Sequence, residues 1–296
     1  MIPLAHLGGG PFEPLQVIAL AAVGSAYALR ALALSREGRP IPTWRLLCFA
    51  AGLSIVAAAL LSPLAHLSEE LLLGHMAQHL LIADIGALLI VLGLTGPLLQ
   101  PLLARRWLGS LRHLAHPLVA LPLWAIDLYL WHAPALYQGA LGSEPLHALQ
   151  HACFIGFGVL MWMPLAGPLP QPRWFGIPAK IGYLIGVRFV GTVLGNVFMW
   201  SNTIFYPDYA AGEAEWNIDP LTDQGIAGVI MTVEGGFATL GVLAWLFLLW
   251  AKQDSERQRL VDLAESRGVP LSDARAARAA AAGQGARLEE RIKGSS

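Results

Sequence analysis

Residues 71–96 have the sequence LLLGHMAQHLLIADIGALLIVLGLTG, which is apolar over most of its length and decides the class of fold. A helix rises about 1.5 Å per residue, so about 20 residues cross the roughly 30 Å hydrocarbon core of a bilayer. The stretch is long enough to span, and Asp84 is its one charged residue. We therefore predict a transmembrane helix that carries a polar motif near its start.

The same pattern recurs along the whole chain. Hydrophobic residues make up 55% of the 296 positions and charged residues 13%, with a mean hydropathy of +0.55, which excludes an ordinary soluble protein. We expect an all-α, polytopic membrane helix bundle in a lipid bilayer, with seven transmembrane helices. The expected spans lie near 14–34, 43–62, 71–96, 117–136, 146–166, 179–201 and 225–251.

The basic residues of the loops predict the orientation. Lys and Arg fall between spans one and two, three and four, and five and six, and after span seven. The segments 1–14, 63–70, 137–145 and 202–224 contain neither residue. Because cytoplasmic loops carry the excess of Lys and Arg, we predict an external N-terminus and a cytoplasmic C-terminus. The net charge of −1 gives no indication of nucleic-acid binding.

The chain divides by composition into two parts. We assign 1–251 to the seven-span transmembrane domain and 252–296 to a charged cytoplasmic tail. Residues 253–266 are expected to continue the last helix, and 272–296 to be disordered. Cys48 and Cys153 lie inside apolar runs and do not form a disulfide framework.

The motif H-x-x-Q-H occurs twice, at 75–79 and at 147–151. Residues four apart share one face of a helix, so each copy presents two imidazoles side by side. Under the predicted topology both copies lie at the external end of their spans, and His132 of the intervening antiparallel span reaches the same level. Neutral imidazole is a ligand for copper, zinc or iron. The expected metal ligands are His75, His79, His132, His147 and His151.

Other polar residues of the spans are candidates for supporting roles. Gln78 and Gln150 are expected to fix the imidazole tautomers, and Met76, Met199 and Met231 are candidate thioethers beside a soft Cu(I) ion. Asp127 and Glu234 are expected just below the histidine layer. The bland alternative is that the histidines anchor the helices at the membrane interface and the charges only fix the bundle.

Asp84 and Arg188 lie nearer the midplane, where we expect them to form an intramembrane charge pair. In an ideal α-helix Asp84 is about half a turn away from the face of His75, so we do not expect it to bind the same ion.

These motifs resemble one known family. Ser62-Pro63, the first H-x-x-Q-H, Trp131-His132-Ala133-Pro134 and the second H-x-x-Q-H are similar to the caa3 cytochrome c oxidase assembly factors of the CtaG type. The resemblance implies a non-enzymatic, multi-pass protein of the bacterial inner (plasma) membrane, needed for maturation of a haem–copper oxidase. It further implies copper delivery, with the oxidase subunits and a periplasmic copper chaperone as partners.

Two other functions fit some of the residues. One histidine from each of two facing helices, such as His79 and His151, would ligate haem in a b-type electron carrier or haem handler. Alternatively, Asp127, Glu234 and Arg188 would line a proton or ion path in a transporter.

Overall fold

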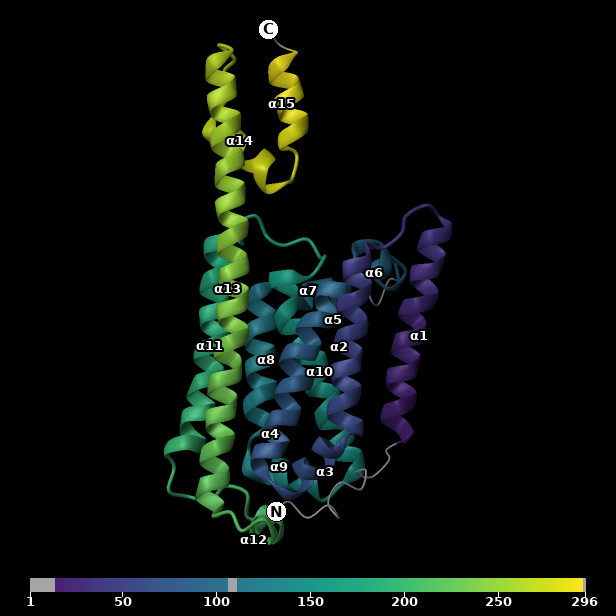
Figure 1. Cartoon of the computed structure of the whole chain (residues 1–296), viewed down its shortest axis with the longest axis vertical. Helices are drawn as coiled ribbons and strands as arrows, with labels where there is room; N and C mark the ends of the chain where they lie inside the picture. The colour runs from purple at the N-terminus through teal and green to yellow at the C-terminus, as the bar shows by residue number, and fades with distance from the viewer. Residues whose placement is uncertain (1–13, 106–110, 295–296) are drawn as a thin grey trace. The chain divides into compact units, whose positions relative to one another are not determined.

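The computed structural model describes residues 14–105 and 111–294, and the secondary structure in these ranges is helical throughout (Figure 1). The expected external segment 1–13 and Arg106 lie outside the described residues. The elements are α1 (Pro14–Arg36), α2 (Thr43–Leu61), α3 (Pro63–Glu70), α4 (Leu72–Leu80), the π-helix η2 (Leu81–Gly86), α5 (Ala87–Gly93), α6 (Gly96–Leu103), α7 (Leu111–Leu114), α8 (Pro117–Trp131), α9 (Pro134–Leu141), α10 (Glu144–Ala166), α11 (Ile177–Trp200), the 3-10 helix η3 (Pro207–Tyr209), α12 (Ala210–Trp216), α13 (Pro220–Ser266), α14 (Asp273–Ala281) and α15 (Gly285–Lys293).

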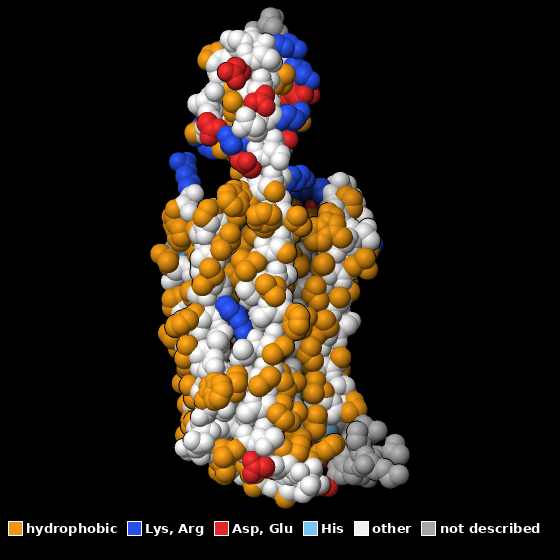
Figure 2. Space-filling model, turned by 60° about the vertical axis from the view of Figure 1, so that its left-hand side comes forward, with side chains coloured by type: hydrophobic (Ala, Val, Ile, Leu, Met, Phe, Trp, Pro, Cys, Tyr) orange, Lys and Arg blue, Asp and Glu red, His pale blue; other side chains and the backbone are white. Residues whose placement is uncertain are grey.

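The predicted polytopic helical fold is confirmed. Six helical segments of the described chain are long and apolar enough to cross a membrane, and a seventh results if α8 and α9 count as one bent span. Hydrophobic side chains cover much of the face of the bundle in Figure 2. Large hydrophobic residues such as Leu130, Phe189 and Phe237 are exposed. This surface suits contact with lipid chains. The orientation of the termini remains a prediction.

The third span is not one uninterrupted α-helix. It runs as α4, then the π-helix η2, then α5. Close packing against α2 accompanies this break: a Cβ on Gly52 would lie 2.8 Å from the carbonyl oxygen of Gly86, and one on Gly86 would lie 2.8 Å from Val56. Because a π-turn brings residues five apart into register, η2 changes which side chains share a face with His79.

The fourth span bends by 69° between α8 and α9. The bend falls at His132-Ala133-Pro134, where Ala133 is extended and Pro134 starts α9. A residue before proline is disfavoured in the α conformation, and proline suits the first turn of a new helix. The bend leaves His132 as the buried C-cap of α8, at the same end of the bundle as the start of α4 and α10.

The tail differs from the sequence expectation. By internal contacts the chain separates into a unit ending at Ala238 and a unit starting at Thr239, within α13, rather than at 251/252. The part expected to be disordered forms α14 and α15. Its apolar residues bury a small core of Leu260, Ala264, Ala276, Leu288 and Ile292. The charged composition suggested disorder. Alanine, however, favours the helical conformation and gives α14 and α15 each a narrow apolar side.

Candidate functional site

Four histidines of the two repeated motifs meet between α4 and α10. The ring centroids of His75 and His79 are 4.1 Å apart, and those of His147 and His151 are 4.3 Å apart. Across the helices, His75 lies 5.5 Å from His147 and 6.5 Å from His151, and His79 lies 5.5 Å from His151. We call these four residues the histidine quartet.

His132 lies beside the quartet, separated from it by one aromatic ring. The Phe154 ring is 4.3 Å from His79 and 5.8 Å from His132, measured between centroids. The structure thus brings all five predicted histidines to one end of the bundle, with His132 next to the quartet rather than inside it.

The imidazoles are buried, and most of their nitrogen atoms lack a hydrogen-bond partner. His75, His79, His132 and His151 are at most 6% exposed, and His147 is partly exposed. Among the described residues, seven buried ring nitrogens have no partner. They are Nε2 of His75, His132 and His147, and both Nδ1 and Nε2 of His79 and of His151. An unpaired buried polar group costs about 1–3 kcal/mol, so the cluster is expensive to hold without a ligand.

Backbone carbonyls, and not the glutamines, set the tautomers of two imidazoles. Nδ1 of His75 is 3.2 Å from the carbonyl oxygen of Ser68, and Nδ1 of His132 is 2.6 Å from that of Leu128. A carbonyl only accepts, so each Nδ1 carries the hydrogen and each Nε2 keeps a lone pair for a ligand.

The glutamines therefore differ from their expected role. The Gln78 amide donates instead to the carbonyl of Ala59, at 2.9 Å. Both ends of the buried Gln150 amide lack a hydrogen-bond partner within the described chain.

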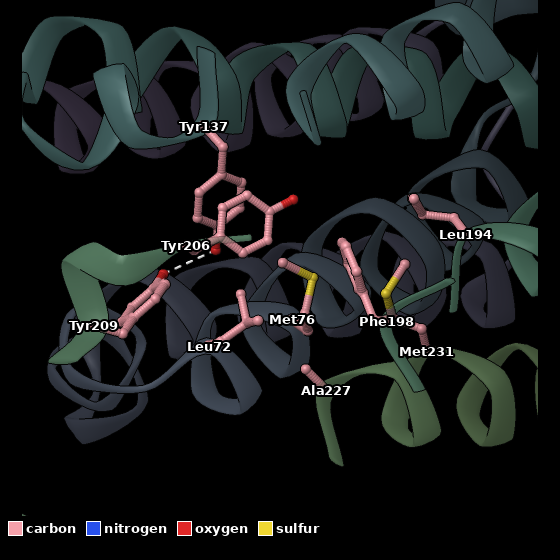
Figure 3. Close-up of a cluster of buried hydrophobic side chains, with 9 residues drawn as sticks. All are labelled: Leu72, Met76, Tyr137, Leu194, Phe198, Tyr206, Tyr209, Ala227 and Met231. Atoms are coloured by element: carbon pink, nitrogen blue, oxygen red, sulfur yellow. Dashed lines mark hydrogen bonds between the residues drawn. The ribbon is translucent and has the colours of Figure 1, made fainter. Parts of the chain in front are cut away.

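Three buried tyrosines lie beside His75 and His132, and sequence reasoning missed them. Tyr137 lies 4.9 Å from His75 between ring centroids and stacks on Tyr206 at 4.0 Å. Tyr209 donates to the carbonyl of Ser68, so the 2.8 Å contact between the hydroxyls of Tyr137 and Tyr209 has Tyr137 as donor. Figure 3 shows Tyr137, Tyr206 and Tyr209 together at one side of the apolar cluster. We call these three residues the tyrosine cap.

The segment after α11 supplies two of these tyrosines and is held in place by hydrogen bonds. Tyr206 donates to the carbonyl of His132 at 2.7 Å. Burial raises the pKa of Tyr206 and of Tyr209, so both hydroxyls stay protonated and keep donating. Aromatic residues amid the acidic residues of 202–224 were the available signal for a structured cover.

A cavity of about 60 Å³ lies beside the quartet, lined in part by His79, His132 and Asp84. Asp84 thus shares a cavity with His79, because the π-helix η2 changes the register between them, and whether it binds the same ion as His75 stays a prediction. The thioethers at this cavity come from Met76, Met161 and Met231. Of the three candidate thioethers, Met76 and Met231 thus line the cavity, whereas the backbone of Met199 lies close to Gly228 of α13.

The intramembrane charges fall in two places. Arg188 donates to the carbonyl of Thr232, and the carboxylates of Glu234 and Asp84 act electrostatically on its guanidinium. No hydrogen bond joins either oxygen of Glu234, or Oδ1 of Asp84, to Arg188 within the described chain, and the Asp84–Arg188 pair stays a prediction. Asp127 is separate, facing Trp131 and Cys153. Neither Asp127 nor Glu234 lines the cavity beside the quartet, within the described residues.

The ring separations within the quartet are close to those that four imidazole ligands of one ion would have. Four imidazoles holding a tetrahedral ion through nitrogens about 2.0 Å away have ring centroids about 5 Å apart. The measured separations of 4.1–6.5 Å bracket that value. Among the described residues, however, no three His, Cys, Asp or Glu side chains are already arranged to hold a metal. Binding would require rotation of the rings.

Comparisons with known proteins agree with the motifs. The family model described as cytochrome c oxidase caa3 assembly factor matches residues 25–253. Uncharacterised proteins of Mycobacterium bovis and Mycobacterium tuberculosis are each 26% identical over 82% of this chain and 39% of their own length. One from Mycobacterium leprae is 24% identical over 78% of this chain and 38% of its own. The chain thus spans about two fifths of these relatives. No solved structure matches.

Proposed function

Because the chain belongs to the cytochrome c oxidase caa3 assembly factor family, we propose that it holds copper at the histidine quartet and delivers it to a haem–copper oxidase. Its partners are then the oxidase subunits and a periplasmic copper chaperone that supplies the ion. In this role the protein is not an enzyme, and it works in a bacterial inner membrane with the quartet at the external side.

The unpartnered nitrogens are the observation that carries this proposal. Seven buried imidazole nitrogens without a partner in the described chain are costly for a folded protein and chemically suited to an ion. His75 presents its Nε2 lone pair, because its Nδ1 hydrogen is engaged by the carbonyl of Ser68. A bound ion would engage the nitrogens that the protein leaves unsatisfied.

Copper is the preferred cargo because the family serves a copper-containing oxidase and because imidazole accepts copper readily. The cavity next to the quartet adds the thioethers of Met76, Met161 and Met231, a donor type that favours the reduced ion Cu(I). His132 faces this cavity and is the residue best placed to receive an ion from His79.

A copper titration of the purified protein tests the proposal. The wild-type protein, stripped with a chelator and titrated with Cu(I) against a competing coloured chelator, is expected to bind tightly at the quartet. The double variant His79→Gln with His151→Gln removes one ligand from each helix and should lose this binding. The matched control His113→Gln changes an exposed histidine at the opposite end of the bundle and should bind as the wild type does.

Assembly is tested separately in a bacterium that lacks its own copy of the gene. The quartet variant should fail to restore oxidase activity, whereas the control should restore it. If the quartet variant binds copper like the wild type, the metal assignment is wrong. If it loses copper but still restores the oxidase, the delivery role is wrong.

The alternatives receive less support. A haem between His79 and His151 would have to enter between rings 5.5 Å apart, and the adjoining cavity is about 60 Å³. Pockets for ligands of comparable size measure roughly 300–1,000 Å³. The transporter hypothesis joins Asp127 to Arg188 and Glu234, but Asp127 lies apart from those two, beside Trp131.

A further inference from the structure

The cavity of about 60 Å³ beside the histidine quartet has walls rich in sulfur. Three of the six methionines of the chain line it, namely Met76 of α4, Met161 of α10 and Met231 of α13. All three are at most 7% exposed, and Figure 3 shows Met76 and Met231 within one apolar cluster. The volume exceeds the roughly 10–15 Å³ that one water-sized occupant needs, so it has room for an ion. We call this space the methionine cavity.

Two imidazoles border the methionine cavity. One is His132, whose Nδ1 hydrogen is engaged by the carbonyl of Leu128 and whose Nε2 has no partner within the described chain. The other is His79, which also belongs to the quartet. A neutral imidazole has one lone pair, so His79 can bind one ion at a time. While it binds an ion in the cavity, three imidazoles remain for an ion at the quartet.

One carboxylate borders the methionine cavity as well. Asp84 is the one acidic residue among the described residues that line it, and its Oδ1 is buried without a hydrogen-bond partner. Arg188 and Glu234 act electrostatically on Asp84. With both carboxylates ionised, these three side chains carry one net negative charge. An unbalanced charge inside a membrane is costly, and one monovalent cation in the cavity would neutralise it. A proton would balance the charge too, but it would leave the thioethers without a use.

We propose that the methionine cavity is a second binding position for Cu(I), distinct from the quartet and joined to it through His79. Thioether sulfur is a soft donor that favours Cu(I), and imidazole accepts copper as well. Asp84 would balance the charge of the ion. The proposal rests on the copper role given above and adds to it a place where one ion is held for transfer while the quartet binds the next.

X-ray absorption at the copper edge tests the proposal. Full-length protein with selenomethionine in place of methionine is purified in detergent, loaded with excess Cu(I) without oxygen, and freed of unbound ion by gel filtration. We expect two ions per chain, with selenium as well as nitrogen among the neighbours of copper. Selenium can neighbour copper only where a methionine side chain binds it, so this signal reports the cavity and not the quartet.

Leucine variants decide whether the cavity is responsible. The pair Met76→Leu with Met231→Leu nearly conserves side-chain volume and should lose one ion together with the selenium signal. The control pair Met163→Leu with Met199→Leu makes the same exchange at methionines that do not line the cavity, and it should keep both. If the first pair does not fold, Met231→Leu alone should still reduce the number of selenium neighbours.

A histidine variant separates this proposal from the copper role of the quartet. The pair His147→Gln with His151→Gln leaves the lining of the cavity intact and should keep the selenium-bound ion while the other is lost. One ion with nitrogen neighbours alone in the wild type would overturn the second position and leave the quartet standing. An undiminished selenium signal in the leucine variants of the cavity would overturn it too. A wild type that binds no copper would overturn both proposals.

Discussion

Replacing His79 with leucine should stabilise the metal-free protein while it removes copper binding. Both ring nitrogens of His79 are buried and have no hydrogen-bond partner in the described chain, and the side chain is 4% exposed. An unpaired buried polar group costs at least about 1 kcal/mol, so removing both ring nitrogens should raise the free energy of unfolding by about 2 kcal/mol. Leucine fills a similar volume beside Phe154. With an unfolding entropy of about 2.1 cal/mol/K per residue, this gain corresponds over 296 residues to a rise in Tm of about 3 °C.

The assay is a thermal unfolding scan in detergent, with copper removed by a chelator and the scan rate held constant. His75→Leu serves as the comparison. This change also removes the hydrogen bond to the carbonyl of Ser68, so its Tm should rise less than that of His79→Leu. Adding Cu(I) should raise the Tm of the wild type and leave that of His79→Leu unchanged. A lower Tm for metal-free His79→Leu would refute the reasoning, since it would mean that these nitrogens are satisfied in the folded protein.

Two further changes test the packing that positions the site. Gly158→Ala should lower the free energy of unfolding by about 1–3 kcal/mol, because its Cβ would lie 2.1 Å from the carbonyl oxygen of Ala83. Gly156→Ala, with no atom within 4 Å, should be neutral or stabilising in the same denaturation series. Asp223→Ala removes the carboxylate that accepts from the first amides of α4 at 2.7 and 2.9 Å and should cost about 1–2 kcal/mol. The exposed Asp208→Ala is its control, and equal effects would contradict this capping role.

Much of the fold was predictable because it depends on local properties of the chain. The length of each apolar run is local, and so is the spacing of His75 to His79 and of His147 to His151. The loop charges predicted that both histidine pairs lie at the same end of the bundle, and the structure places their rings side by side. The bend at Pro134 has a local signal too, since proline follows Ala133 within the span predicted near 117–136.

The remainder depends on packing between distant segments. The π-helix arises where the third span packs against Gly52 of α2, so no helical periodicity could place Asp84 in the cavity with His79. Tyr206 and Tyr209 come from a loop without periodicity, and only the folded chain brings Tyr209 beside His75 and Tyr206 to the carbonyl of His132. In the tail, single apolar residues such as Leu288 are weak signals until α13 lies beside them.

The tyrosine cap has a consequence for the path of a bound ion. Its three residues are at most 2% exposed, and Tyr137 and Tyr209 lie against the ring of His75. Away from the cap, His147 is partly exposed and lines a small pocket together with His151. An ion held at the quartet would then exchange with the solution past His147, while the side of His75 stays closed until the segment after α11 moves. A chelator in solution would reach the ion from the side of His147, and a partner that takes the ion past His75 would first have to displace the cap.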